Sequence, residues 1–146
     1  MGNVLNNECL CIPIIVWFFV QSCKVITDLL VNGKLNIRRF VGAGGMPSSH
    51  SALVTSLATV VACRHGFEST EFALSVLFAC VVMYDAAGIR RAAGKQAKVL
   101  NQIIASQGKN INIQEKLTEL LGHTPLQVYI GALIGIVLSY ILWLIW

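Results

Sequence analysis

Four long apolar stretches, separated by three polar connections, constrain this chain more than any other feature. They cover about residues 9–31, 51–63, 72–87 and 125–146. Of the 146 residues, 55% are hydrophobic and only 12% are charged, whereas about a quarter of the residues in soluble domains are charged. This balance excludes a soluble globular domain and a disordered chain. Because a membrane-spanning helix needs about 20 residues, the chain has room for about four.

The pattern therefore predicts an all-α fold, a polytopic membrane helical bundle of about four transmembrane helices with one or two short helices on the cytoplasmic side. Residues 1–146 would form a single membrane-embedded domain. One short helix is expected over 89–106 and another around 113–121, ending at Gly122. The second and third apolar stretches are short for a full span, which predicts tilt or burial among the neighbouring helices.

The placement of the basic residues predicts the orientation of the bundle. Nine of the 11 Lys and Arg residues fall in the first and third connections, which lie on one side of a four-span protein: Lys34, Arg38, Arg39, Arg90, Arg91, Lys95, Lys98, Lys109 and Lys116. The positive-inside rule makes that side cytoplasmic and puts both termini outside. We therefore expect an integral protein of the plasma (inner) membrane. The basic residues form no single run with interleaved aromatics, so nucleic acid is not an expected partner.

The five cysteines lie mostly inside apolar stretches. Their odd number and lack of paired spacing favour small buried hydrophobic residues over a disulfide framework or a metal site. A bundle of four short helices is compatible with a homodimer, although no motif indicates one.

A glycine-rich loop at residues 42–47 leads into the second apolar stretch. Ser48 or Ser49 can cap the helix that follows, whose free amides and dipole favour an anion. His50 falls in the first turn, where it can donate a proton to a leaving oxygen. The alternative is an ordinary loop and cap with an interfacial histidine.

Two further groups of polar residues flank the ends of apolar stretches. Asp85 lies near the end of the third stretch, where Arg90 and Arg91 can pair with it or with a phosphate. His123 precedes the fourth stretch, where Pro125 suits the first helical position. The alternatives are an ion pair at the membrane surface and an ordinary loop histidine. For Lys95 and Lys98 a lipid-facing basic helix is the favoured interpretation.

The first stretch carries Gln21, Lys24 and Asp28 at helical spacing. Lys24 can extend to the interface or pair with Asp28, or all three can point into the bundle. In an up-and-down bundle all of these polar groups meet at one end. Two histidines, two helix N-termini and several cations in one pocket match phosphoryl transfer through a histidine.

Three sequence strings carry a family resemblance: Gly-Gly-Met-Pro-Ser-Ser-His-Ser-Ala at 44–52, Tyr-Asp-Ala-Ala-Gly-Ile-Arg-Arg at 84–91 and Leu-Gly-His-Thr-Pro at 121–125. The chain resembles the divergent small-membrane-protein branch of the type 2 phosphatidic acid phosphatase and vanadium-dependent haloperoxidase superfamily. The resemblance implies a lipid phosphate phosphatase that needs no cofactor or metal. Its substrate would be a phosphomonoester or diphosphate of a membrane lipid, such as phosphatidic acid, phosphatidylglycerophosphate or a prenyl phosphate.

The resemblance also implies a role for each candidate residue. His123 would form the phosphohistidine, and His50 would be the general acid. The phosphate would be bound by a set of cationic and hydroxyl side chains: Lys24, Arg39, Ser48, Ser49, Arg90 and Arg91. The parent pattern has an acid four residues after the nucleophile, where this chain has Gln127. We therefore expect Asp85 to supply the missing negative charge. Two alternatives are an inactive relative that binds or transports an anionic lipid, and a Mg²⁺-dependent lipid-phosphate enzyme that uses Asp85.

Overall fold

The computed structural model describes residues 4–33, 45–106, 117–119 and 121–146 of the chain. Regular structure in these ranges is entirely helical, which confirms the predicted all-α class. A short 3-10 helix, η1, precedes five α-helices: η1 (Val4–Asn6), α1 (Glu8–Asn32), α2 (Ser49–His65), α3 (Thr70–Ala87), α4 (Ile89–Ser106) and α5 (Pro125–Ile145). The four apolar stretches correspond to α1, α2, α3 and α5, and α4 is the short helix expected over 89–106.

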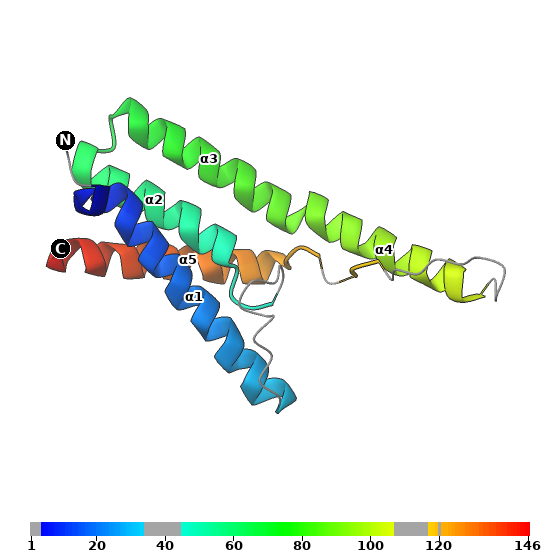
Figure 1. Ribbon diagram of the computed structural model, residues 1–146. Coiled ribbons are helices and arrows are strands. Elements are labelled where there is room, and N and C mark those ends of the chain that lie inside the picture. The colour runs from blue at the N-terminus through cyan, green and yellow to red at the C-terminus, as the bar shows by residue number, and fades with distance from the viewer. Residues whose placement is uncertain (1–3, 34–44, 107–116, 120) are drawn as a thin grey trace.

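Helix α2 is the inner helix of the bundle, with α1, α3 and α5 packed around it (Figure 1). Nine of its 17 residues are buried. A core cluster joins the side chains of Ile12, Val16 and Val20 from α1 to Ala52 and Val60 from α2. The hydroxyl groups of Thr55 and Thr59 on α2 are tolerated in this interior because they bond to helix carbonyls.

Two glycines allow α5 to approach α2 closely. A Cβ atom added at Gly131 would overlap the backbone carbonyl of Ser48, and one added at Gly135 would overlap the side chain of Thr55. Across this contact the Thr55 hydroxyl donates to the carbonyl oxygen of Ala132 at 3.1 Å. Small residues at positions i and i+4 bring membrane helices together in this way. The contact holds the beginnings of α2 and α5 side by side.

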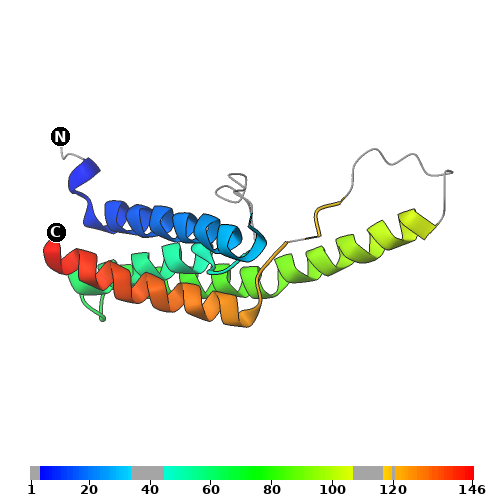
Figure 2. The same ribbon diagram turned by 90° about the horizontal axis from the view of Figure 1, so that it is seen from below.

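Three of the described helical segments are long and apolar enough to cross a membrane. They are 8–30 in α1, 125–145 in α5, and a window within 70–106, which joins α3 and α4. Helix α2 has only 17 residues and lies between the other three, as its shorter apolar stretch predicted. The two ends of the chain lie at the same end of the bundle (Figures 1 and 2).

Helix α4 continues in nearly the same direction as α3 and extends beyond the bundle (Figure 1). The short helix expected around 113–121 is wrong for the described part of that range, because 117–119 and Leu121 are not helical, and residues 113–116 lie outside the description. This segment instead runs along α4. The Asn101 side chain donates to the Leu117 carbonyl at 2.9 Å and accepts from the Leu117 amide at 3.1 Å. Backbone groups that a helix would have paired internally are thus satisfied by α4.

Candidate active site

The predicted polar groups meet at the end of the bundle where α1 and α3 finish and α2 and α5 begin. We call this the polar end. Lys24, near the end of α1, is 4% exposed, and its Nζ donates a hydrogen bond to Ser49 Oγ at 2.9 Å. Gln21 is equally buried. These two side chains are therefore buried in the bundle, whereas Asp28, the third member of the predicted inward group, is only half-buried. A buried ammonium is costly unless it meets a hydrogen-bonding or anionic partner.

Ser48 caps the N-terminus of α2. Its hydroxyl oxygen accepts from the Ser51 amide at 3.3 Å and from the Ser51 hydroxyl at 2.9 Å. Its own amide donates to the carbonyl oxygen of Gln127 in the first turn of α5 at 3.2 Å. This bond places two helix N-termini side by side, and each carries free amides and a partial positive charge.

His123 lies between the end of α3 and the beginning of α5 and is 3% exposed. Its amide donates to the carbonyl oxygen of Ala86 at 2.9 Å, which fixes the loop to the last turn of α3. The imidazole Nδ1 is buried and makes no hydrogen bond with any described residue. An unpaired buried ring nitrogen is unusual in a folded protein and calls for an explanation.

Burial lowers the pKa of His123 below the ordinary value of 6.5, and the nearby charge of Lys24 lowers the pKa further. Hydrogen bonds of the His123 ring with the Gln127 side chain and the Gly45 backbone act in the opposite direction and raise the pKa. Since burial and the cation prevail, the imidazole is neutral at neutral pH. A neutral imidazole is the form that can attack phosphorus.

Gln127 has a structural role at the start of α5. Its side-chain oxygen accepts from the Thr124 amide at 3.0 Å, and its own amide donates to the Thr124 hydroxyl at 3.4 Å. The two residues form a capping box. The amide that replaces the expected acid therefore stabilises the helix start and makes no hydrogen bond to Nδ1 of His123.

Asp85 does not make the contact with His123 that we expected. Its carboxylate forms a salt bridge with Nε of Arg90, one turn further along the chain. It does not bond to Nδ1 of His123, since that atom has no described partner. The acid on α3 thus holds the first arginine of α4.

Gly122, with φ of 79°, lies so close to the backbone of Arg90 and Arg91 that any side chain at this position would collide with that backbone.

His50 in the first turn of α2 links these groups electrostatically. It interacts with the charges of Arg90, Lys24 and Asp85, and it contributes to the electrostatic environment of His123. The two histidines, Lys24 and the Asp85–Arg90 pair thus lie close enough to influence one another's charge, and their role as one site stays a prediction.

The structure leaves some predicted site residues apart from this group. Arg39 lies outside the described residues. The side chain of Arg91 is exposed, as are those of Lys95 and Lys98 further along α4. In the described part of the chain, no three His, Cys, Asp or Glu side chains gather to hold a metal ion.

The contact of Gly131 and Gly135 with α2 was not predicted from the sequence, although two glycines four residues apart in an apolar helix are a signal for such a contact.

Comparison with known proteins identifies the family. The model of the Divergent PAP2 family matches residues 5–138 of this chain. The uncharacterized membrane protein YuiD of Bacillus subtilis (strain 168) is 41% identical over 152 residues, covering 96% of this chain and 96% of its own length. The chain therefore belongs to the Divergent PAP2 family and is a phosphatase-like membrane protein. No solved structure matches it.

Proposed function

We propose that this protein is a lipid phosphate phosphatase that hydrolyses a phosphomonoester or diphosphate through a phosphohistidine on His123. The observation that carries the proposal is the buried imidazole, neutral and without a described partner on Nδ1, close to the ammonium group of Lys24. Phosphatidic acid, phosphatidylglycerophosphate and prenyl phosphates are the candidate substrates. All of them place a phosphate at the membrane surface and hydrocarbon in the bilayer.

The phosphate would bind at the polar end between the two helix N-termini. Lys24 and Arg90 neutralise its charge, and Ser48 and Ser49 offer hydroxyl and amide donors. The hydrogen bond from Lys24 to Ser49 already orients these two groups toward each other at 2.9 Å. Arg39, outside the described residues, and the exposed Arg91 remain in the phosphate-binding set only as the resemblance implies. Asp85 acts through its salt bridge as a positioning residue for Arg90.

Chemistry proceeds in two displacements. In the first, a ring nitrogen of His123 forms a bond to phosphorus while the bond from phosphorus to the alcohol oxygen breaks. The negative charge of the bound phosphate would favour the protonated form of His50, which gives its proton to that oxygen. In the second, water attacks phosphorus, the phosphorus–nitrogen bond breaks, and neutral His50 takes a proton from the water. Inorganic phosphate leaves, and both histidines return to their starting forms. The cations stabilise the charge on the equatorial oxygens in both steps.

The excess of basic residues in the first and third connections favours a cytoplasmic polar end, so the substrate would come from the inner leaflet. Every residue in the proposed site comes from one chain, and the chemistry would not depend on a homodimer.

One observation favours a second function, the binding or transport of an anionic lipid without hydrolysis. No described carboxylate bonds to His123, because Gln127 caps α5 and Asp85 pairs with Arg90. A carboxylate would stabilise the positive charge that the ring acquires when its nitrogen bonds to phosphorus. A binding protein has no need for that charge.

The deciding experiment measures phosphate release by detergent-purified protein from a panel of lipid phosphates, with and without EDTA. His123→Ala is the test variant, and His65→Ala at the exposed far end of α2 is the matched control. We expect release that survives EDTA, is abolished in His123→Ala and is unchanged in His65→Ala. Binding of the same lipids without any release would support the second function. Release that stops with EDTA would favour a Mg²⁺-dependent enzyme using Asp85.

A further inference from the structure

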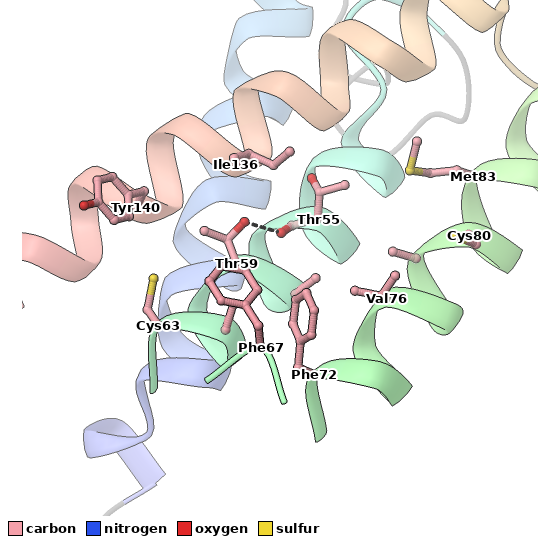
Figure 3. Close-up of a pocket in the computed structure, with 13 residues that line it drawn as sticks. Thr55, Thr59, Cys63, Phe67, Phe72, Val76, Cys80, Met83, Ile136 and Tyr140 are labelled. Atoms are coloured by element: carbon pink, nitrogen blue, oxygen red, sulfur yellow. Dashed lines mark hydrogen bonds between the residues drawn. The ribbon is translucent and has the colours of Figure 1, made fainter. Parts of the chain in front are cut away.

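An apolar groove runs along α2 between α3 and α5, on the side of the bundle away from α1 (Figure 3). It encloses about 550 Å³, within the range of about 300–1,000 Å³ that is usual for small-molecule sites. Its only hydroxyls on α2 come from Thr55 and Thr59, and both donate to carbonyls of their own helix, at 2.8 Å in each case. The groove therefore presents a surface suited to hydrocarbon.

One end of the groove lies next to the polar end of the bundle. Met83 and Thr55 line this end. Met83 precedes Ala86 by one turn of α3, and the Ala86 carbonyl accepts the hydrogen bond from the His123 amide. A ligand lying in the groove would thus reach the His123 loop without crossing another helix.

The other end of the groove is lined by two aromatic rings from the α2–α3 connection and the first turn of α3. Phe67 and Phe72 meet edge to face, with ring centroids 5.2 Å apart and an interplanar angle of 85°. Figure 3 shows this pair at the opposite end from Met83. From Phe72 to Met83 there are 11 residue steps, or about 16 Å at the helical rise of 1.5 Å per residue. That is about half the thickness of the bilayer hydrocarbon, the depth of one leaflet.

We infer that this groove holds one hydrocarbon chain of the lipid whose phosphate lies at the polar end, and that the Phe67–Phe72 pair limits the length of chain it accepts. This inference rests on the proposed function, since it assumes a phosphate beside His123. A hydrocarbon chain is the occupant that the surroundings supply, because the flanking helices expose large apolar side chains such as Leu77 and Ile136. The cations at one end supply the complementary charge for its headgroup.

The groove would discriminate between lipids by the length of chain that fits in it. Burial away from water contributes little, because a chain in a bilayer or micelle is already surrounded by hydrocarbon. Chains up to the limit should bind about equally well. A longer chain must displace the aromatic pair, and overpacking of this kind lowers affinity by about tenfold.

The test uses lipid phosphates with one saturated chain of increasing length, with binding to the intact protein measured by native mass spectrometry. Phe72→Ala removes one ring and should move the limit to longer chains. Val76→Phe places a ring inside the groove, about one turn of α3 from Phe72, and should move the limit to shorter chains. The longest chain that wild type accepts should then bind about tenfold more weakly. Leu77→Phe is the matched control, since this neighbouring side chain is 64% exposed on the outer face of α3. It should leave the length profile unchanged.

Hydrolysis is measured in parallel with a water-soluble aryl phosphate, which has no chain to place in the groove. A length limit that moves with both variants supports the groove even if no phosphate is ever released, in which case the proposed function alone fails. Active protein with a profile that neither variant changes overturns the groove and leaves the function intact. Equal binding of chain alcohols without phosphate would also overturn the inference, because the groove would then hold any bilayer hydrocarbon.

Discussion

The two ends of α2 carry similar residues in opposite settings. At its beginning, Ser49 and His50 lie beside Lys24, whose ammonium is buried and bonded to a hydroxyl. At its end, Arg64 and His65 are exposed, and Arg64 donates to the carboxylate of Glu8 at 2.8 Å. A cation and a histidine occur together at both ends. Only the polar end removes them from water.

This difference supports our proposal that the polar end is the site of chemistry. An exposed ion pair is solvated and screened, and it contributes little to stability. A buried cation beside helix N-termini strongly favours an incoming anion and holds its partners in place before the anion arrives. The far end of α2 therefore serves as an internal control for the polar end in the predictions below.

The largest contrast is expected between the two cations. Lys24→Met should lower kcat/KM for a lipid phosphate by about a thousandfold, because a charge at the transferring phosphoryl group is lost. Arg64→Met should change kcat/KM by less than about twofold. The thermal midpoint of Lys24→Met should be unchanged or higher, since methionine buries no charge. A large drop in that midpoint, matching the loss of activity, would mean that Lys24 is structural.

A second contrast compares His50 with His65. His50→Gln should reduce the rate on an alkyl phosphate by about a hundredfold or more, because the leaving oxygen is no longer protonated. An aryl phosphate has a better leaving group and should be affected much less. His65→Gln should affect neither substrate. Equal losses on both substrates would show that His50 is not the general acid.

The contact between α2 and α5 offers a third test. Gly131→Ala should destabilise the protein by about 1–3 kcal/mol, because the new methyl group overlaps the Ser48 carbonyl. It should also lower activity, since the Ser48–Gln127 hydrogen bond positions both helix starts. Val137→Leu, at a half-exposed site on α5, is the control. Thermal unfolding in detergent measures both, and a fully stable Gly131→Ala protein would contradict the close packing.

A smaller effect follows from the lowered pKa of His123. The unfolded imidazole titrates near pH 6.5, and the folded one titrates at a lower pH. Between these values the unfolded state binds more protons, so stability falls as the pH decreases from about 6.5 through the folded pKa. Removing this group in His123→Gln should flatten the slope of the thermal midpoint against pH, whereas His65→Gln should not. An unchanged slope in His123→Gln would indicate that His123 has an ordinary pKa.

The smallest effect is expected at the far end of α2. Breaking the exposed Arg64–Glu8 pair with Glu8→Gln should cost no more than about 1 kcal/mol. Thermal unfolding at low and high salt would check this value. The difference in stability between wild type and Glu8→Gln should shrink at high salt, because salt screens the ion pair. A loss above about 2 kcal/mol would mean that the two ends of α2 differ less than we propose.

The sequence alone predicts the helices and their meeting at the polar end, because apolar length and chain direction fix both. The spacing of Gln21 and Lys24 puts them on one face of the helix, but it left open whether that face meets the bundle or the interface. The pairing of Asp85 with Arg90 does not follow, since both His123 and Arg90 are reachable from the end of α3. The capping role of Gln127 could not be predicted from the sequence for the same reason, because two interactions compete for one side chain. Its spacing from His123 suggested a catalytic position, while its spacing from Thr124 created the capping box.

Local signals failed where tertiary contacts decide the conformation. Residues 117–119 fall within the short helix that the sequence predicts but are not helical, and Asn101 of α4 supplies hydrogen bonds to Leu117. The weak apolar character of α2 reflects its inner position, where most of its hydroxyl side chains are buried among the other helices. Only the arrangement of the whole bundle determines both outcomes.

The most direct measurement is to look for the covalent intermediate on His123. The protein would be mixed with a lipid phosphate carrying labelled phosphorus and quenched in alkali, which preserves phosphohistidine. Our account predicts label on the wild-type chain during turnover, located on the peptide that contains His123, and none on His123→Ala. Continued turnover without label on that peptide, or label that persists in His123→Ala, would contradict it.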